Sequence, residues 1–258
     1  MNASPISEVT AALIVIGDEI LSGRTKDVNI GTIADFCTDM GIALKEVRVV
    51  SDEQDDIVAA VNAVRPRYTY VFTTGGIGPT HDDITADAVA KAFGVALEVN
   101  ETARRVLEER YGTVDVSPAR LRMARVPVGG HLIENTVSGA PGFVIGNVYV
   151  MAGVPKIMQA MLENLATTLV GGTKMDSRTV ECGVGESTIA AGLEAIQNAH
   201  PATKIGSYPQ MGRMPVMTQL VIRSTDPAEL AVATAEVQAM VDELHAKRNI
   251  DLHKDTTT

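Results

Sequence analysis

The stretch VFTTGGIGPTHDDIT, residues 71–85, decides how the first half of this chain folds. An apolar, strand-like run ends at two threonines, a glycine turn follows, and two adjacent aspartates, Asp82 and Asp83, precede a run with the pattern of a helix. A strand, a glycine turn and a helix N-terminus in that order direct free backbone N–H groups toward an incoming anion. Two aspartates carry the wrong charge for such a place, so any predicted function has to account for both features.

The segments on either side alternate between strand and helix. Apolar, β-branched runs predict buried strands at 11–19, 43–52 and 68–74. Amphipathic runs predict helices at 28–41, 52–66, 85–94, 100–111, 117–124 and 154–170. Two short strands are predicted within 142–153, around a Gly146-Asn147 turn. This alternation predicts an α/β fold, a three-layer, mostly parallel sheet with helices on both faces.

The pattern changes after Gly171-Gly172, where a run of about eighty residues reads strand, helix, strand, strand, helix. Such a run is too short for a second doubly wound sheet and predicts a small α+β domain. We therefore expect four parts: a flexible N-terminus over 1–10, the α/β domain over 11–172, the accessory domain over 173–250 and a tail over 251–258.

The composition excludes several classes of protein. Of 258 residues, 45% are hydrophobic and 21% charged, with 32 acidic against 22 basic side chains. The acidic balance and the scarcity of aromatic residues argue against nucleic acid or an anionic membrane as a partner. With no basic leader and no apolar run of membrane-spanning length, we expect a cytoplasmic protein. Cys37 and Cys182 are predicted to be buried, reduced thiols.

Acidic residues follow each of the three predicted parallel strands. The first strand ends at Asp18 and Glu19, the second at Asp52, and the third at the glycine turn that precedes Asp83. Because ligands of open α/β sheets bind outside the carboxyl ends of the strands, these side chains could line one crevice. Aspartates and phosphate oxygens can share a divalent cation, which would reconcile the acids with a phosphate-binding turn.

A simpler interpretation of the aspartates stays open. Thr80 and Asp83 fit the T-x-x-D pattern of a helix cap, and an aspartate near a helix N-terminus is favoured by the helix dipole alone. Asp52 could likewise serve as an N-cap. His81 could act as a general acid, although a loop histidine is more often solvated.

Five segments together resemble the molybdopterin-binding domain superfamily of molybdenum cofactor biosynthesis. They are GDEILSGRTKDVN (17–29), VVSDEQDDI (49–57), TTGGIGPTHDDIT (73–85), ENTVSGAPGF (134–143) and VYVMAGVPKIM (148–158). Within it they look most like the competence/damage-inducible protein A (CinA) branch and the related domain of FAD synthases. The resemblance covers roughly 11–170 and extends to the accessory domain that follows.

The resemblance implies a glycine loop that holds a phosphate or pyrophosphate. The residues it implies for phosphate or nucleotide binding are Thr74, Gly75, Gly76, Gly78, Pro79, Thr80, Ser138, Gly139 and Pro141. It implies catalytic roles for Asp52 and Asp83. Together with the acids that follow the strands, it leads us to expect that Asp18 and Lys156 are also catalytic, and that Glu19, Asp82 and Asp83 hold a divalent metal, magnesium or another such as cobalt.

The chain departs from the pterin-adenylating members at two positions. Asp82 stands where they have a basic residue, and Ile77 stands where they have threonine. Both departures argue against pterin adenylyl transfer. The CinA branch is instead associated with metal-dependent cleavage of the pyrophosphate bond in ADP-ribose or FAD, which fits the extra carboxylate of Asp82. The alternatives are a pterin adenylyltransferase and a non-catalytic protein that binds a pterin or nucleotide. Self-association into a homo-oligomer also stays open.

Overall fold

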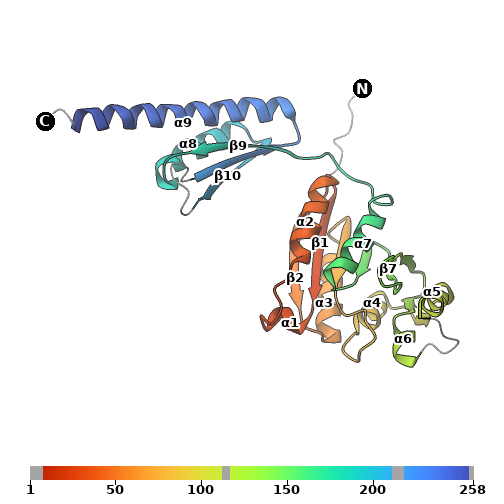
Figure 1. Cartoon of the computed structure of the whole chain (residues 1–258). Helices are drawn as coiled ribbons and strands as arrows, with labels where there is room; N and C mark the ends of the chain where they lie inside the picture. Colours follow the sequence, from red (N-terminus) through yellow and green to blue (C-terminus); the bar gives the residue numbers. More distant parts are fainter. Residues whose placement is uncertain (1–7, 112–116, 211–217, 256–258) are drawn as a thin grey trace, which may run out of the picture. The chain divides into compact units, whose positions relative to one another are not determined.

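The computed structural model describes residues 8–111, 117–210 and 218–255, with side chains up to residue 247. The chain divides into two compact units, residues 1–173 and 174–258 (Figure 1). The ends of the predicted N-terminus and tail, 1–7 and 256–258, lie outside the described residues. No helix of the described part is long and apolar enough to span a membrane.

The first unit is built on a six-stranded sheet in the order β2-β1-β3-β8-β7-β6. Its strands are β1 (Thr10–Ile16), β2 (Ala43–Val50), β3 (Tyr70–Thr74), β6 (His131–Ile133), β7 (Gly142–Ile145) and β8 (Val148–Met151). The first four in spatial order are parallel, and β7 and β6 add antiparallel neighbours. The mostly parallel α/β sheet predicted from the sequence is confirmed.

Helices cover both faces of this sheet, which explains why β1 is apolar at almost every position. On one face Ala12, Ile14 and Ile16 pack in a core that includes side chains of α3 (Gln54–Val64) and α4 (Thr85–Phe93). On the other, Ala11, Leu13 and Val15 pack in a core that includes side chains of α2 (Asn29–Asp39) and α7 (Pro155–Leu165). Alternate side chains of a strand point to opposite faces, so a strand covered on both sides is apolar throughout.

Several short elements were not predicted. They are the helix α1 (Asp18–Leu21) and the strands β4 (Leu97–Val99), β5 (Arg125–Pro127) and β6. Elements of three or four residues carry too little periodicity to be read from sequence. The predicted helices in this region are present as α5 (Glu101–Tyr111) and α6 (Pro118–Arg122).

The second unit is a three-stranded antiparallel sheet in the order β10-β11-β9 with two helices. Its elements are β9 (Asp176–Cys182), α8 (Glu186–Ala199), β10 (Thr203–Pro209), β11 (Thr218–Ser224) and α9 (Pro227–Asp255). The helix α9 continues past 250, so the predicted tail begins within it. Cys182 is buried in this unit and Cys37 in the first, and both are free thiols.

Candidate functional site

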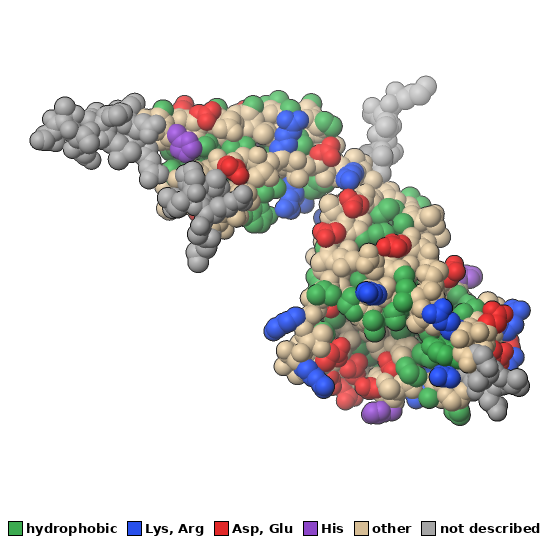
Figure 2. Space-filling view, viewed as in Figure 1, with side chains coloured by type: hydrophobic (Ala, Val, Ile, Leu, Met, Phe, Trp, Pro, Cys, Tyr) green, Lys and Arg blue, Asp and Glu red, His purple; other side chains and the backbone are tan. Residues whose placement is uncertain are grey.

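The carboxyl ends of four parallel strands meet at one edge of the first sheet. Ile16 of β1 is paired with Val50 of β2, and Thr74 of β3 is paired with Val15 and with Met151 of β8. The segments that leave these strands therefore start side by side. Figure 2 shows acidic side chains gathered at the lower end of the first unit, where α1 lies in Figure 1.

The glycine turn after β3 requires its glycines. Gly75 has φ +105° and Gly76 has φ +65°, conformations that residues with a Cβ rarely adopt. A Cβ on Gly75 would collide with the carbonyl oxygen of Ile16, and one on Gly76 with the Thr85 hydroxyl. The backbone thus passes directly over the end of β1 and packs closely against the Thr85 side chain.

Thr85, the first residue of α4, ties this turn to the helix. Its hydroxyl donates to the Gly75 carbonyl oxygen at 2.9 Å, and its backbone N–H donates to the Gly76 carbonyl oxygen at 3.0 Å. Gly153, after β8, packs on the other side, where an added Cβ would lie 3.2 Å from the Gly75 Cα. The segment AGVP, residues 152–155, and the glycine turn are therefore in backbone contact. Thr85 was not among the predicted site residues.

Asp83 closes a local turn instead of opening the helix. One of its carboxylate oxygens, Oδ2, accepts hydrogen bonds from the Thr80 backbone N–H at 2.8 Å and from the Thr80 hydroxyl. The bond from the Thr80 N–H is one half of a capping box, but the Asp83 N–H donates to the Thr80 carbonyl oxygen at 3.3 Å instead of to the hydroxyl, and α4 begins only at Thr85. The Asp83 carboxylate also lies against Gly78, where a Cβ would collide with it. One carboxylate oxygen of Asp83 is thus committed to shaping the loop.

Asp18 and Asp52 form an interlocked pair between the ends of β1 and β2. The Asp18 backbone N–H donates to Asp52 Oδ2 at 2.9 Å, and the Asp52 N–H donates to Asp18 Oδ1 at 3.4 Å. Burial is the largest cause of a raised Asp52 pKa, and the charges of Asp18, Glu19 and Asp82 raise it further. Negative charge from two other segments, the start of α1 and the glycine loop, therefore acts on Asp52.

The neighbouring loop positions are open to solvent. The Asp82 side chain is 61% exposed and that of His81 97%, with His81 Nδ1 lying 3.9 Å from the Asp82 carboxylate. The pKa of Asp82 is lowered, chiefly by hydrogen bonds from Thr80 and its own backbone, with smaller effects of His81 and Arg122. Arg122 of α6 also donates to the Asp83 carbonyl oxygen at 3.2 Å, a contact the sequence did not suggest.

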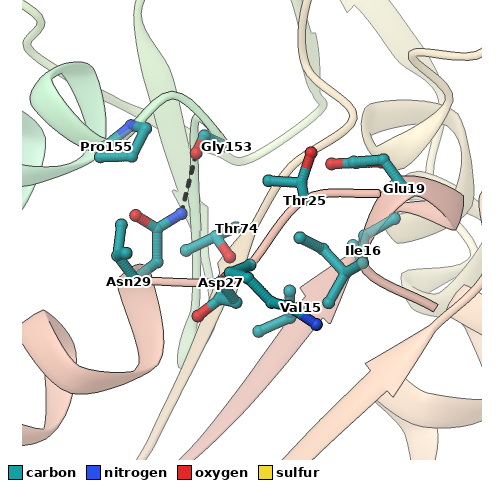
Figure 3. Close-up of a pocket in the computed structure, with 12 residues that line it drawn as sticks. Val15, Ile16, Glu19, Thr25, Asp27, Asn29, Thr74, Gly153 and Pro155 are labelled. Carbon is teal, nitrogen blue, oxygen red and sulfur yellow. Dashed lines mark hydrogen bonds between the residues drawn. The ribbon is translucent and has the colours of Figure 1, made fainter. Parts of the chain in front are cut away.

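A pocket lies beside the turn, between the α1–α2 connection and the start of α7 (Figure 3). Of the predicted site residues only Glu19 and Thr74 line it; the others are Val15, Ile16, Ile20, Thr25, Lys26, Asp27, Val28, Asn29, Gly153 and Pro155. Asn29 Nδ2 donates to the Gly153 carbonyl oxygen at 2.8 Å, drawn dashed in Figure 3. Asn29 Oδ1 and Thr74 Oγ1 are buried without a hydrogen-bond partner.

The segment with Ser138, Gly139 and Pro141 reaches the same edge farther along the sheet. Gly142 follows it and begins β7, which is antiparallel to β8, so the segment lies at the carboxyl end of β8. It is ordered by Asn135, whose Oδ1 accepts from the Ser138 N–H at 3.1 Å. In spatial order β7 is two strands from β3. Lys156 is exposed in the first turn of α7, and Pro79 is exposed in the glycine loop.

The described residues contain no group of three or more histidine, cysteine or acidic side chains arranged to hold a metal ion. The acids at this edge do converge, but Asp83 is turned toward Thr80 and Glu19 toward the pocket. A divalent ion here would therefore need ligands from the substrate. Magnesium commonly binds in this way, through one or two carboxylates and phosphate oxygens.

Fold and site together define a ligand-binding open-sheet α/β domain, followed by a small α+β unit. The chain belongs to the family described as probable molybdopterin binding domain, whose model matches residues 12–171. A second model, described as FAD synthase, middle domain, matches residues 174–249.

The relatives are archaeal proteins of similar length. One from Aeropyrum pernix is 31% identical over 252 residues, which cover 91% of this chain and 94% of the relative. Protein Ta0487 of Thermoplasma acidophilum is 32% identical, covering 78% of this chain and 80% of the relative. A crystal structure from Thermoplasma acidophilum, described as protein CinA with unknown function, is 36% identical with a TM-score of 0.60, and covers 63% of this chain and 99% of that one. The chain is thus a CinA-like member of the family.

Proposed function

We propose that this protein is a divalent-metal-dependent pyrophosphatase that cleaves ADP-ribose- or FAD-like dinucleotides. The observation that carries the proposal is the placement of the glycine turn and the Asp18–Asp52 pair at one edge of the sheet. The match of residues 174–249 to a model named for FAD synthase supports a flavin-type or other dinucleotide substrate. We place the activity in the cytoplasm.

The diphosphate would lie on the backbone of Gly75–Thr80. Within it the Gly75 N–H donates to the Met151 carbonyl oxygen and the Thr80 N–H to Asp83, and Pro79 has no N–H. The N–H groups of Gly76, Ile77 and Gly78 would therefore bind the anion, with the dipole of the following helix α4 in support. The contact between Gly75 and Gly153 brings the start of α7 to the same place, and Lys156 in its first turn could approach the phosphates. Ser138, Gly139 and Pro141 lie farther along the edge, where a long dinucleotide could reach them.

Asp52 is the residue we assign to activating water. Its pKa is raised by burial and by neighbouring acids, which makes it a better proton acceptor than an ordinary aspartate. Asp18, locked to Asp52 through both backbone N–H groups, would fix its orientation. A bound divalent ion would offset the charge that develops on the phosphoryl oxygens. Its ligands would come from Asp18, Asp82, Glu19 or the free oxygen of Asp83, together with the substrate.

A non-catalytic pterin- or nucleotide-binding protein is the second candidate. The observation that favours it is the family description, probable molybdopterin binding domain, which fits binding of a pterin without turnover. An adenylyltransferase would differ from both, because it consumes a second substrate.

Phosphorus NMR of the protein with ADP-ribose, FAD or ATP distinguishes these functions. With magnesium or cobalt, a pyrophosphatase releases AMP from ADP-ribose or FAD, and a chelator abolishes the release. Asp52→Asn should slow hydrolysis on the order of 10²-fold, as expected for loss of a general base. Asp35→Asn, at an exposed position of α2, is the matched control and should leave the rate unchanged. Intact dinucleotides after long incubation with either metal would refute the proposed activity.

A further inference from the structure

The pocket beside the glycine turn has aliphatic walls with polar groups among them. Ile20, Val28 and Pro155 are among the residues that line it. Val28 is 55% exposed, so apolar surface of the pocket is open to solvent. Exposed aliphatic side chains at the mouth of a pocket favour a flat apolar surface as the ligand group.

Two residues that line this pocket each have a buried polar atom without a hydrogen-bond partner among the described residues. Asn29 is 4% exposed; its amide nitrogen bonds the Gly153 carbonyl oxygen, which leaves Oδ1 as an unpaired acceptor. Thr74 is 1% exposed, and its hydroxyl is also unpaired. Leaving such an atom unpaired destabilises the folded protein. Buried polar atoms are nearly always paired, so two in one pocket point to a bound group that satisfies them.

The chemistry of the missing partner follows from these atoms. An amide oxygen such as Asn29 Oδ1 can only accept, so the ligand must supply an N–H or O–H donor there. A hydroxyl such as that of Thr74 can donate to a ring nitrogen or accept from an amino group. An amino-bearing nitrogen heterocycle supplies both, and its faces suit the aliphatic walls.

We propose that this pocket binds the heterocyclic ring of the ligand through Asn29 Oδ1 and Thr74 Oγ1. Thr74 directly precedes Gly75, so a ring held here is followed by phosphates at the glycine turn. The inference rests on the part of the proposed function by which a nucleotide or pterin binds at this edge of the sheet. It does not depend on hydrolysis of that ligand. Adenine and pterin rings share the required amino group, and binding measurements separate them.

The matched variants are neighbours on the same strand. Thr74→Val removes the pocket hydroxyl and keeps the shape of the side chain. Thr73→Val does the same at a residue that is equally buried and unpaired but points to the opposite face of the sheet. Because neither hydroxyl has a protein partner, both variants should fold with unchanged or slightly raised melting temperature.

Calorimetric titration without metal, using AMP and a pterin as separate probes, tests the inference. For the ring that binds, Thr74→Val should weaken affinity about tenfold, the loss of one good hydrogen bond, and Thr73→Val should not change it. If AMP binds, purine riboside 5′-monophosphate, which lacks the amino group, should bind more weakly than AMP. Equal loss in both variants, no loss in Thr74→Val, or binding of neither ring would overturn the inference. Selective binding without hydrolysis would instead refute only the proposed activity.

Discussion

At the scale of single residues, Asp52 occupies the electrostatically least favourable position among the acidic residues at this edge of the sheet. Its carboxylate is partly buried and faces the charges of Asp18, Glu19 and Asp82. Its hydrogen bond from the Asp18 N–H opposes this effect but does not outweigh it. The charged Asp52 carboxylate therefore lowers the stability of the folded state. Carboxylates with perturbed pKa values are concentrated at functional sites.

Asp52→Asn is predicted to stabilise the fold at neutral pH. The amide oxygen can still accept from the Asp18 N–H, while the charge is removed. Since the folded pKa of Asp52 is raised, its charged form destabilises the protein at pH values above that pKa, and the penalty disappears as the pH falls and the carboxyl is protonated. The melting temperature of the variant should therefore exceed that of the wild type at pH 7, with the difference shrinking toward pH 4. A variant less stable than the wild type at pH 7 would contradict this assignment.

Gly76 offers a second test at this scale, with Gly94 as its control. Both have φ near +65° to +68°, but a Cβ on Gly76 would collide with the Thr85 hydroxyl, whereas Gly94 faces open space. Gly94→Ala should cost about 1–2 kcal/mol, the strain of the left-handed conformation alone. Gly76→Ala should cost more and also displace the glycine turn. Equal unfolding free energies of the two variants in denaturant titrations would show that the glycine turn accommodates an added methyl group at no further cost.

At the scale of elements, the junction of the glycine turn and α4 depends on one threonine. Thr85→Val removes the hydroxyl that donates to the Gly75 carbonyl oxygen and leaves that buried group unpaired. The expected loss is about 1–3 kcal/mol, with weaker ligand binding at the turn. Thr32→Val, which removes an exposed side-chain bond within the first turns of α2, is the control and should change stability little. If both variants unfold at the same denaturant concentration, Thr85 does not anchor the turn.

A second junction lies in the other unit, where His200 at the end of α8 meets α9. Its Nδ1 lies 3.1 Å from the Glu229 carboxylate and its Nε2 lies 3.1 Å from that of Glu236. Hydrogen bonds to these two glutamates raise the His200 pKa above its ordinary value, Glu229 contributing most. The protonated imidazole thus joins the end of α8 to Glu229 and Glu236, which lie two helical turns apart on one side of α9.

This contact predicts that the second unit loses stability as the pH rises. A histidine whose folded pKa is raised contributes its full stabilisation below the unfolded pKa, about 6.5, and loses it as the pH passes through the folded value. Thermal unfolding followed from pH 6 upward should show this decline, and His200→Gln should abolish it. His131→Gln, at an exposed site of the first unit, should leave it intact. A pH profile that His200→Gln does not alter would contradict the prediction.

The sequence predicted the elements that repeat a pattern and missed contacts between distant segments. β1 could be predicted because burial on both faces makes every residue apolar. The helix that follows it, α1, could not be predicted, because its four residues form a single turn and show no periodicity. Asn29 was missed because its role depends on the Gly153 carbonyl oxygen, 124 residues away. The contact of Asp83 with Thr80, by contrast, could be predicted from the T-x-x-D spacing, because the two residues are only three positions apart.

At the scale of the whole molecule, the two units have separate hydrophobic cores. The core of the second unit is formed by side chains of its own strands and helices, among them Val180, Ile189, Leu220, Ile222 and Val237. The cores of the first unit draw only on residues before 173. The boundary between the units coincides with the boundary between the two family models. Each unit therefore meets the physical definition of a domain that can fold alone.

The last prediction follows from these separate cores: residues 174–258, expressed alone, should fold cooperatively. Eighty-five residues with their own core exceed the size, about 40 residues, below which a domain usually needs disulfides or a metal. The isolated fragment should show a single sigmoidal unfolding transition in urea by circular dichroism. Val237→Ala, which truncates a side chain buried in that core, should lower its unfolding free energy by about 1–3 kcal/mol. Val232→Ala, at an exposed position of the same helix, should change it little. A gradual, non-cooperative transition of the fragment would mean that the second unit requires the rest of the chain.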